Sequence, residues 1–141
     1  MRDYYRFIKY QILSNLKTFI YYLIIFLSRS NKEHQKFCIL VASYNNEDYC
    51  IKNLLSIENQ EYSQFRVIYI NDNSSDLTME KVNNFIKKSI IRKKFMIIES
   101  NKRNGSLLNK YKAIHEHCND DEIIISLDGD DYFSNNYVLR Y

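Results

Sequence analysis

Three aspartates near the C-terminus directly follow an apolar stretch. Residues 123–127 read Ile-Ile-Ile-Ser-Leu, and the chain continues through Asp128, Gly129, Asp130 and Asp131. A continuous apolar run of β-branched residues is typical of a parallel strand that is buried on both faces. Carboxylates this close together repel one another unless a cation lies among them, and Mg²⁺ or Mn²⁺ binds such oxygen ligands and accepts a diphosphate as a further ligand. The segment therefore predicts a metal–diphosphate site at the end of a strand.

Three other polar segments follow apolar runs in the same way. Together with the aspartates, these segments are residues 43–48, 72–76, 104–105 and 128–131. The carboxyl ends of parallel strands lie at one edge of an open α/β sheet, where such sheets bind their ligands. We therefore expect the four segments to meet in space and to form one site.

The elements that must position these segments follow from the spacing of the apolar residues. Strands are predicted at residues 37–42, 65–70, 95–98 and 123–127. Apolar residues at helical spacing predict helices at residues 49–60, 79–86 and 107–114. Strands that alternate with helices indicate right-handed βαβ units and a parallel sheet, so the predicted fold class is α/β.

Composition limits the class of protein. A chain of 141 residues with 45% hydrophobic content forms one modest domain, and a net charge of +3 gives no reason to expect a nucleic-acid partner. The scattered cysteines Cys38, Cys50 and Cys118 indicate reduced thiols in a reducing compartment. Neither G-x-G-x-x-G nor a P-loop is present, which excludes these two nucleotide fingerprints. Glycans at the sequons of Asn73 or Asn104 would block the predicted site, which favours a cytoplasmic location.

The N-terminal region has a separate pattern. Residues 18–28 are uncharged and very apolar, with basic residues on both sides. A membrane-spanning helix needs about 20 such residues, and Lys17 interrupts any longer window. Three interpretations stay open: a helix at a membrane interface on the cytosolic side, a short or tilted signal anchor, and a helix packed on the domain. We expect an apolar helix and polar hinge at residues 1–36 and a folded domain at residues 37–141.

Three motifs occur in a characteristic order: V-A-S-Y-N-N-E-D-Y, I-N-D-N-S-S-D and L-D-G-D-D, at residues 41–49, 70–76 and 127–131. In this order and spacing the chain resembles the family-2 glycosyltransferases of the GT-A fold, over about residues 37–141. The resemblance implies a Rossmann-like, mostly parallel sheet with flanking helices. It also implies a nucleotide-sugar donor, with a UDP-sugar expected, and an unknown glycan, lipid or protein as acceptor.

The same resemblance assigns roles to individual residues. It places three residues of the first loop in the nucleoside pocket: Ser43, Asn45 and Glu47. Asp72 would accept a hydrogen bond from the base N–H, and Asp128 would contact the ribose. Asp130 would bind Mg²⁺ or Mn²⁺, with Asp131 nearby.

The chain departs from the family pattern in two respects. The third loop of the family often carries Arg-Asn, but here Leu108 precedes Asn109. The basic contact with the diphosphate is therefore either missing or supplied by Lys110 or Arg103. In the family, the acceptor half and the catalytic base come after the position that corresponds to Tyr141. The sequence therefore predicts an incomplete GT-A domain that transfers sugar only with further C-terminal parts or a partner. The alternative is a non-catalytic, degenerate transferase that acts as a binding or interaction domain.

Ordinary structural roles would also explain several of these residues. Asp72 and Asp76 could cap the helix that follows them, and Glu47 could stabilise a helix N-terminus through its dipole. The aspartates at 128–131 could form an acidic turn that ends a strand. Such roles can coexist with ligand binding, so the sequence leaves both interpretations open.

Overall fold

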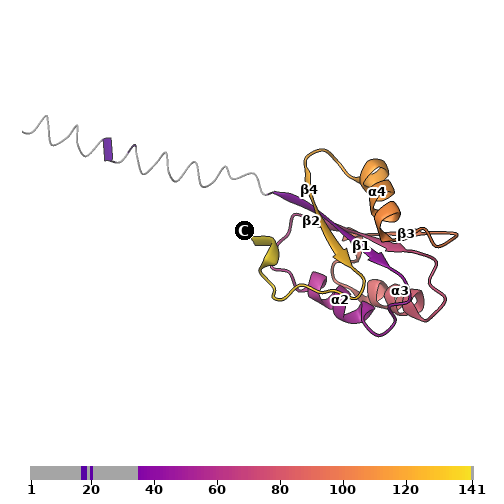
Figure 1. Ribbon diagram of the computed structural model, residues 1–141. Coiled ribbons are helices and arrows are strands. Elements are labelled where there is room, and N and C mark those ends of the chain that lie inside the picture. The colour runs from indigo at the N-terminus through magenta and orange to yellow at the C-terminus, as the bar shows by residue number, and fades with distance from the viewer. Residues whose placement is uncertain (1–16, 19, 21–34, 141) are drawn as a thin grey trace, which may run out of the picture. The chain divides into compact units, whose positions relative to one another are not determined.

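The computed structural model describes residues 17–18, 20 and 35–140. One compact unit comprises Gln35–Tyr141 (Figure 1). Lys17, Thr18 and Ile20 are helical and exposed, and the rest of the predicted apolar helix at residues 18–28 lies outside the described residues. Within the described residues, no helix has both the length and the apolar character needed to cross a membrane.

The unit is built on a sheet of four parallel strands in the order β3-β2-β1-β4. Their bounds are Lys36–Ser43 (β1), Phe65–Asn71 (β2), Phe95–Glu99 (β3) and Glu122–Asp128 (β4). Ser43 pairs with Asn71, and Ala42 pairs with Asp128. The carboxyl ends of β2, β1 and β4 therefore lie side by side, and the predicted parallel α/β sheet is confirmed.

Three α-helices flank the sheet: α2 at Cys50–Glu58, α3 at Thr78–Lys88 and α4 at Ser106–His117. Short 3₁₀ helices follow α3 at Arg92–Lys94 (η1) and close the described chain at Val138–Arg140 (η2). In Figure 1, α2 and α3 cover one face of the sheet and α4 covers the other. In α2 and α3, apolar residues three and four positions apart lie on the face that packs on the sheet. In α4 the buried apolar residue is Ala113, whereas Leu107, Leu108, Tyr111 and Ile114 are exposed.

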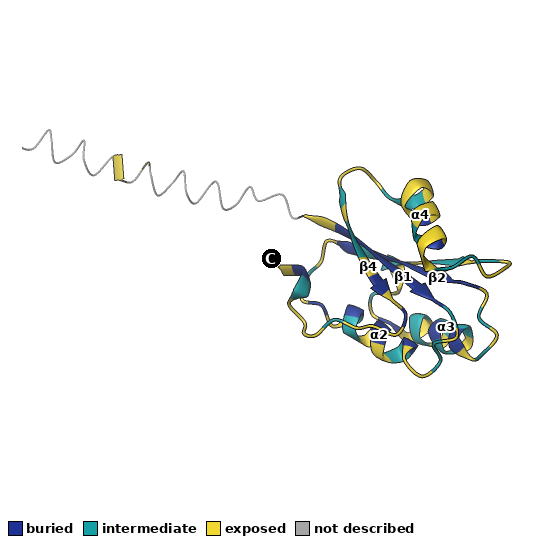
Figure 2. Ribbon diagram, viewed as in Figure 1, coloured by how far each residue is buried: buried dark blue, intermediate teal, exposed yellow. Residues whose placement is uncertain are grey.

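The core is centred on β1, which is buried along nearly its whole length (Figure 2). Alternate residues of a strand point to opposite faces. Ile39 and Val41 accordingly pack with Leu54 of α2, whereas Cys38 and Leu40 pack on the α4 side. The run of apolar residues at 37–42 is thus explained by burial on both faces.

The prediction that residues 123–127 are buried on both faces is wrong. Ile123 is 46% exposed, and most of β4 is only partly buried. Within the described part of the chain β4 pairs with β1 alone, so its outer edge has no strand beside it. A run of isoleucines predicts a strand but does not tell a central strand from an edge strand.

Candidate functional site

The polar segments at the carboxyl ends of the strands meet as predicted. The N–H of Asp72, just after β2, donates to the carbonyl of Ser43 at 2.8 Å. The N–H of Gly129, just after β4, donates to the carbonyl of Ala42, also at 2.8 Å. The ends of β2 and β4 are therefore both fastened to the end of β1, which lies between them.

Asp72 lies at the centre of this edge and is only 3% exposed. Its two carboxylate oxygens accept the backbone N–H groups of Asn104 at 2.7 Å and Gly105 at 2.8 Å. Burial by itself would raise the pKa of Asp72, but these N–H groups, the adjacent Asn109 amide and the charge of Arg103 together hold it below its usual value. The Asn109 Nδ2 is buried and has no hydrogen-bond partner within the described chain. Asp72 is thus a buried, ionised acceptor.

Asp128 is bound from α4. Lys110 Nζ forms an ion pair with Asp128 Oδ1 at 2.5 Å, and the Ser106 hydroxyl donates to the same oxygen at 3.3 Å. The Asp128 side chain is 52% exposed, so its second oxygen is open to a ligand. Because Asp72 holds Asn104 and Gly105 while Ser106 contacts Asp128, one short loop connects the two aspartates.

The Asp128–Asp131 turn is held in place from below. Asn53 of α2 is fully buried, and its amide donates to the carbonyl oxygens of Asp128 at 3.1 Å and Asp131 at 2.8 Å. A Cβ at Gly129 would lie 2.7 Å from Ser43 Oγ and 2.8 Å from Ser43 Cβ. A glycine is therefore required where the turn packs against β1.

Asp130 and Asp131 project from this turn and are exposed. The Asp130 side chain forms no hydrogen bond or ion pair with any described residue, so it is available to a cation. The three aspartates do not form a ready-made metal cage, because the one group of three possible ligands that converges among the described residues is Cys38, Cys118 and Glu122. Mg²⁺ is usually held by one or two carboxylates together with substrate phosphates, and this arrangement suits Asp130.

The cluster of Cys38, Cys118 and Glu122 does not fit a metal ion. Both oxygens of Glu122 are bound by the guanidinium of Arg66, at 2.6 and 2.8 Å. Burial and the neighbouring Cys118 raise the pKa of the Cys38 thiol to about 12, so that thiol keeps its proton. The cluster is a partly buried structural contact between β1, β4 and the end of α4.

Side chains of the first loop, residues 43–48, form hydrogen bonds with the segment between β2 and α3. Ser43 is 1% exposed, and its hydroxyl has no hydrogen-bond partner in the described chain. The Asn45 side chain accepts the N–H of Ser75 at 2.9 Å, and Glu47 Oε2 accepts the N–H of Leu77 at the start of α3, also at 2.9 Å. Glu47 thus stabilises a helix N-terminus, that of α3, and the nucleoside contacts of these residues stay predictions.

Asp76 has the capping role that its sequence position suggests. Its Oδ1 accepts the N–H of Thr78 at 3.0 Å, and its Oδ2 accepts the N–H of Glu47 at 3.1 Å. Burial would raise the pKa of Asp76, but these bonds and the Thr78 hydroxyl lower it below its usual value. Asp76 therefore connects the first loop to α3.

Sequence reasoning missed one contributor to the site, Asn53. Asn53 carries no signal in the sequence, because it lies inside a helix far along the chain from the turn it supports. The Arg103 guanidinium lies over the Tyr44 ring, 4.1 Å from its centre, and its contact with the diphosphate stays a prediction. Lys110, the other cation proposed for the diphosphate, is paired with Asp128.

A cavity of about 310 Å³ opens beside this site, between α4 and the loop after β3. It is lined by residues of both, among them Asn104 and Asn109. Neither Asp128 nor Asp130 lines it, so the cavity adjoins the loop that holds Asp72 without including the predicted metal ligand.

Comparison with known families settles the class of protein. The family model described as glycosyl transferase family 2 matches residues 38–140, which is most of the chain. The chain belongs to glycosyl transferase family 2. The resemblance seen in the sequence is thereby confirmed, and the site described above is the strand-end edge of a family-2 domain.

Individual relatives agree with this assignment. An uncharacterised glycosyltransferase of Haemophilus influenzae is 32% identical over 102 residues, which are 72% of this chain and 30% of that protein. The crystal structure of S. aureus TarS 1-349 in complex with UDP is 25% identical, with a TM-score of 0.63, and the match covers 74% of this chain and 30% of TarS. The family-2 domain thus has the GT-A fold and spans about a third of the length of these relatives.

A more distant structure has the same fold. The mannosyltransferase PcManGT from Pyrobaculum calidifontis, solved in complex with GDP-Man and Mn²⁺, has a TM-score of 0.66 and 18% identity. The match covers 74% of this chain and 30% of that one. At this identity the likeness shows the fold alone.

Proposed function

We propose that this family-2 domain binds a nucleoside diphosphate sugar together with a divalent cation and takes part in transfer of the sugar to an acceptor. The observation that carries the proposal is the junction of Asp72 and Asp128 through the single loop 104–106. This junction puts a buried, ionised carboxylate and an exposed pair of carboxylates at one sheet edge. A nucleoside and its diphosphate need acceptors of these two kinds.

The nucleoside end of the donor would contact the first two loops. Asp72 is ionised, and each of its carboxylate oxygens has a further lone pair beyond the bond it already accepts, which suits a base N–H. Asp128 keeps one oxygen open and would accept a ribose hydroxyl. Ser43, Asn45 and Glu47 would complete the pocket around the base and ribose.

The diphosphate end would lie over the Asp128–Asp131 turn. Mg²⁺ or Mn²⁺ held by Asp130, with Asp131 nearby, would neutralise the charge that develops on the departing nucleoside diphosphate. Lys110 lies within reach of the same turn through Asp128 and would add positive charge there. We favour UDP-sugar as the donor because UDP is bound in the 25% identical TarS complex.

The acceptor and its binding residues are proposed to lie elsewhere. An unknown glycan, lipid or protein would accept the sugar, and further C-terminal parts or a partner would supply the general base. We also propose a cytoplasmic location, on the ground of the free cysteines in the described domain.

Isothermal titration calorimetry of the full chain with UDP, with and without Mn²⁺, tests the proposal. We expect Mn²⁺ to strengthen UDP binding, and Asp130→Ala to remove that increase. Asp120→Ala is the matched control, because Asp120 is another exposed aspartate and lies in the turn before β4. Equal Mn²⁺ dependence in the wild type and Asp130→Ala would contradict the assignment of Asp130.

A non-catalytic binding domain is the second candidate. It is favoured by the structural use of two predicted ligands, since Glu47 caps α3 and Asp128 is already paired with Lys110. Absence of UDP binding at millimolar concentration, with or without Mn²⁺, would support this candidate over the transferase.

A further inference from the structure

A basic corner lies between α3 and β3. Residues 87–94 read Lys-Lys-Ser-Ile-Ile-Arg-Lys-Lys, which places five cations in eight residues and includes no acidic side chain. The corner consists of the last two residues of α3, a turn and the 3₁₀ helix η1. This density of cations is far above that of the whole chain, which has 20 Lys and Arg among 141 residues and a net charge of +3.

The tip of the corner is an exposed apolar side chain. Ile90 is 89% exposed, although an isoleucine of ordinary packing would be largely buried. The backbone at the tip is held firmly, since Glu58 Oε1 accepts the Ser89 hydroxyl at 2.6 Å and the Ile90 N–H at 3.0 Å. Ile90 is therefore presented to the outside by a braced turn.

The cations around Ile90 are largely free. Four of them are exposed and form no ion pair or side-chain hydrogen bond with described residues: Lys87, Lys88, Arg92 and Lys93. Lys94 is the exception, because its ammonium donates to the Ser63 carbonyl at 2.7 Å and lies over the Phe65 ring. Glu58, which braces the turn, is the acidic group in contact with the corner.

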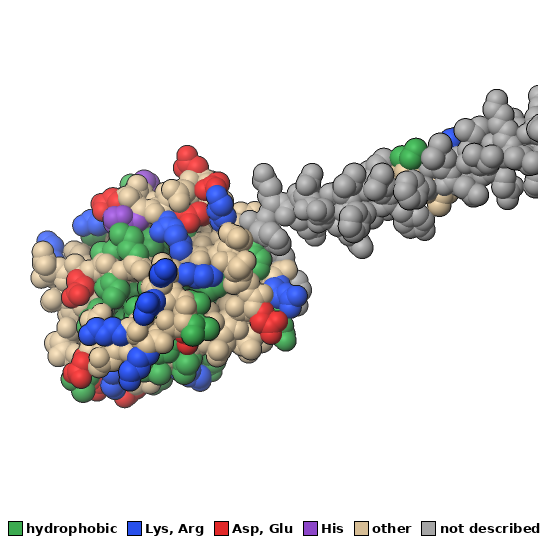
Figure 3. Space-filling model, turned by 180° about the vertical axis from the view of Figure 1, so that it is seen from behind, with side chains coloured by type: hydrophobic (Ala, Val, Ile, Leu, Met, Phe, Trp, Pro, Cys, Tyr) green, Lys and Arg blue, Asp and Glu red, His purple; other side chains and the backbone are tan. Residues whose placement is uncertain are grey.

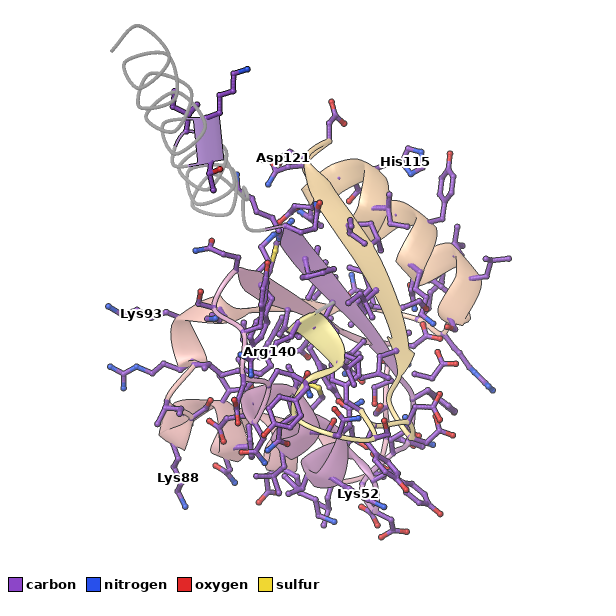
Figure 4. All side chains as sticks on the ribbon, turned by 90° about the vertical axis from the view of Figure 1, so that its left-hand side faces the viewer. Lys52, Lys88, Lys93, His115, Asp121 and Arg140 are labelled. Carbon is purple, nitrogen blue, oxygen red and sulfur yellow. The ribbon has the colours of Figure 1, made fainter. Side chains whose placement is uncertain are left out.

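Two of these side chains, Lys88 and Lys93, are labelled in Figure 4. Lys88 and Lys93 project outward on the same side of the domain in Figure 4. The rear face in Figure 3 carries several Lys and Arg side chains close to exposed apolar ones. The arrangement leaves the cations accessible to a partner larger than a single ion.

We propose that the basic corner docks on an anionic membrane surface, with Ile90 inserted among the lipid headgroups. Lysine and arginine side chains near an anionic bilayer each contribute roughly a fivefold gain in affinity, and an apolar side chain at the interface adds burial. Nucleic acid is the less favoured partner, because an apolar tip has no role in phosphate contact and the corner has no aromatic or amide side chain to read bases.

The position of the corner suits such docking. Residues 92–94 lead into the amino end of β3, whereas the candidate site lies at the carboxyl ends of the strands. Because the sheet is parallel, the corner lies at the amino ends of the strands and the candidate site lies at their carboxyl ends. Docking at this edge would leave the candidate site open to solvent.

The absence of tryptophan from the chain permits a direct test. Ile90→Trp places a single tryptophan at the tip, and Leu107→Trp, at an 85% exposed position on α4, is the matched control. The full chain is titrated with vesicles of phosphatidylcholine, with and without phosphatidylglycerol. We expect a blue shift for Ile90→Trp with anionic vesicles only and none for Leu107→Trp. A chain that sediments with vesicles without a shift at position 90 would overturn the proposal.

Charge reversal supplies a second test in the Ile90→Trp background. Lys88→Glu with Lys93→Glu should weaken vesicle binding roughly 25-fold or more, from the removal of two cations. Lys52→Glu with Lys112→Glu changes the net charge equally at exposed positions outside the corner and should have a much smaller effect. Equal effects of the two pairs would overturn the proposal, as would a shift with a DNA oligonucleotide in place of lipid. Neither result depends on UDP binding.

Discussion

At the scale of single residues, Asp72 shows how a buried charge is made stable. Its carboxylate is removed from water, and two backbone N–H groups of the loop after β3 take the place of the lost solvent. Hydrogen bonds to an ionised acceptor are stronger than those between neutral groups. Asp72 therefore orders the loop 104–105 through these two bonds.

Asp72→Asn should destabilise the domain. An asparagine side chain offers one acceptor oxygen, so one of the two N–H groups would remain buried without a partner, at a cost of about 1–3 kcal/mol. The free energy of unfolding in urea measures this loss. Asp130→Asn, at an exposed side chain without contacts, should change it by no more than about 0.5 kcal/mol. Equal unfolding free energies for the two variants would contradict the role given to Asp72.

Gly129→Ala should destabilise the domain for a steric reason. The new methyl group would overlap the side chains of Ser43 and Asn46, and overpacking of this kind costs about 1–3 kcal/mol. The cost should shrink in a Ser43→Gly background, which removes the Cβ and hydroxyl that the methyl group meets. At Gly105, where φ is +87 and the space is open, alanine is strained by its backbone alone. The cost of Gly105→Ala should therefore not depend on residue 43.

At the scale of elements, α2 acts on the site through one side chain. Asn53→Ala removes two hydrogen bonds to the Asp128–Asp131 turn, which should cost about 2 kcal/mol of unfolding free energy. The turn would also lose its support, so Mn²⁺-dependent UDP affinity should fall in calorimetry. Asn84→Ala, at an exposed position on α3, is the control and should change neither quantity. An unchanged affinity in Asn53→Ala would mean that the turn is positioned without α2.

The link between β2, β4 and α4 should appear in the pH dependence of stability. Arg66 binds both oxygens of Glu122 and also donates to the carbonyl of His117 at the end of α4. The hydrogen bond from Arg66 outweighs the effect of burial and holds the pKa of Glu122 below its usual value of 4.5.

Because the pKa of Glu122 is lower in the folded state, its contribution to stability is present above about pH 4.5 and is lost as the pH falls through the folded-state value. Urea unfolding between pH 7 and 3 should therefore show a shallower acid loss in Glu122→Gln than in the wild type. Glu116→Gln, at a side chain that is 63% exposed, should retain the wild-type slope. A wild-type slope in Glu122→Gln would show that the ion pair does not stabilise the fold.

At the scale of the whole molecule, stability should be highest at β1 and lower at the sheet edges. β1 pairs with strands on both sides and is buried, whereas β3 and β4 are the edge strands of the described sheet. Amide hydrogen exchange should therefore be at least about tenfold faster in β4 than in β1. Equal protection of β4 would show that its outer edge is covered. Repeating the measurement at two protein concentrations would distinguish coverage by a second copy of the chain from coverage by another part of the same chain.

The sequence by itself determined the class of fold and the place of the site. Apolar runs separated by helical patterns predict a parallel α/β sheet. The reason is local, because the side of a strand or helix that is buried determines the spacing of its apolar residues. The polar segments beginning at Ser43, Asp72 and Asp128 each follow such a run, and parallel strands necessarily bring those ends to one edge. The three motifs were sufficient for the family resemblance, which the family model confirmed.

Only the tertiary structure decided which groups are partners at that edge. Glu47 caps α3 instead of its own helix, Lys110 neutralises Asp128, and Asn53 holds a turn 75 positions away along the chain. The apolar residues at 123–127 also did not show that β4 is an edge strand. Residue types indicate that a segment prefers a strand, but they do not indicate which strands will lie beside it. Such contacts depend on how distant segments pack, and packing is a property of the assembled sheet and helices.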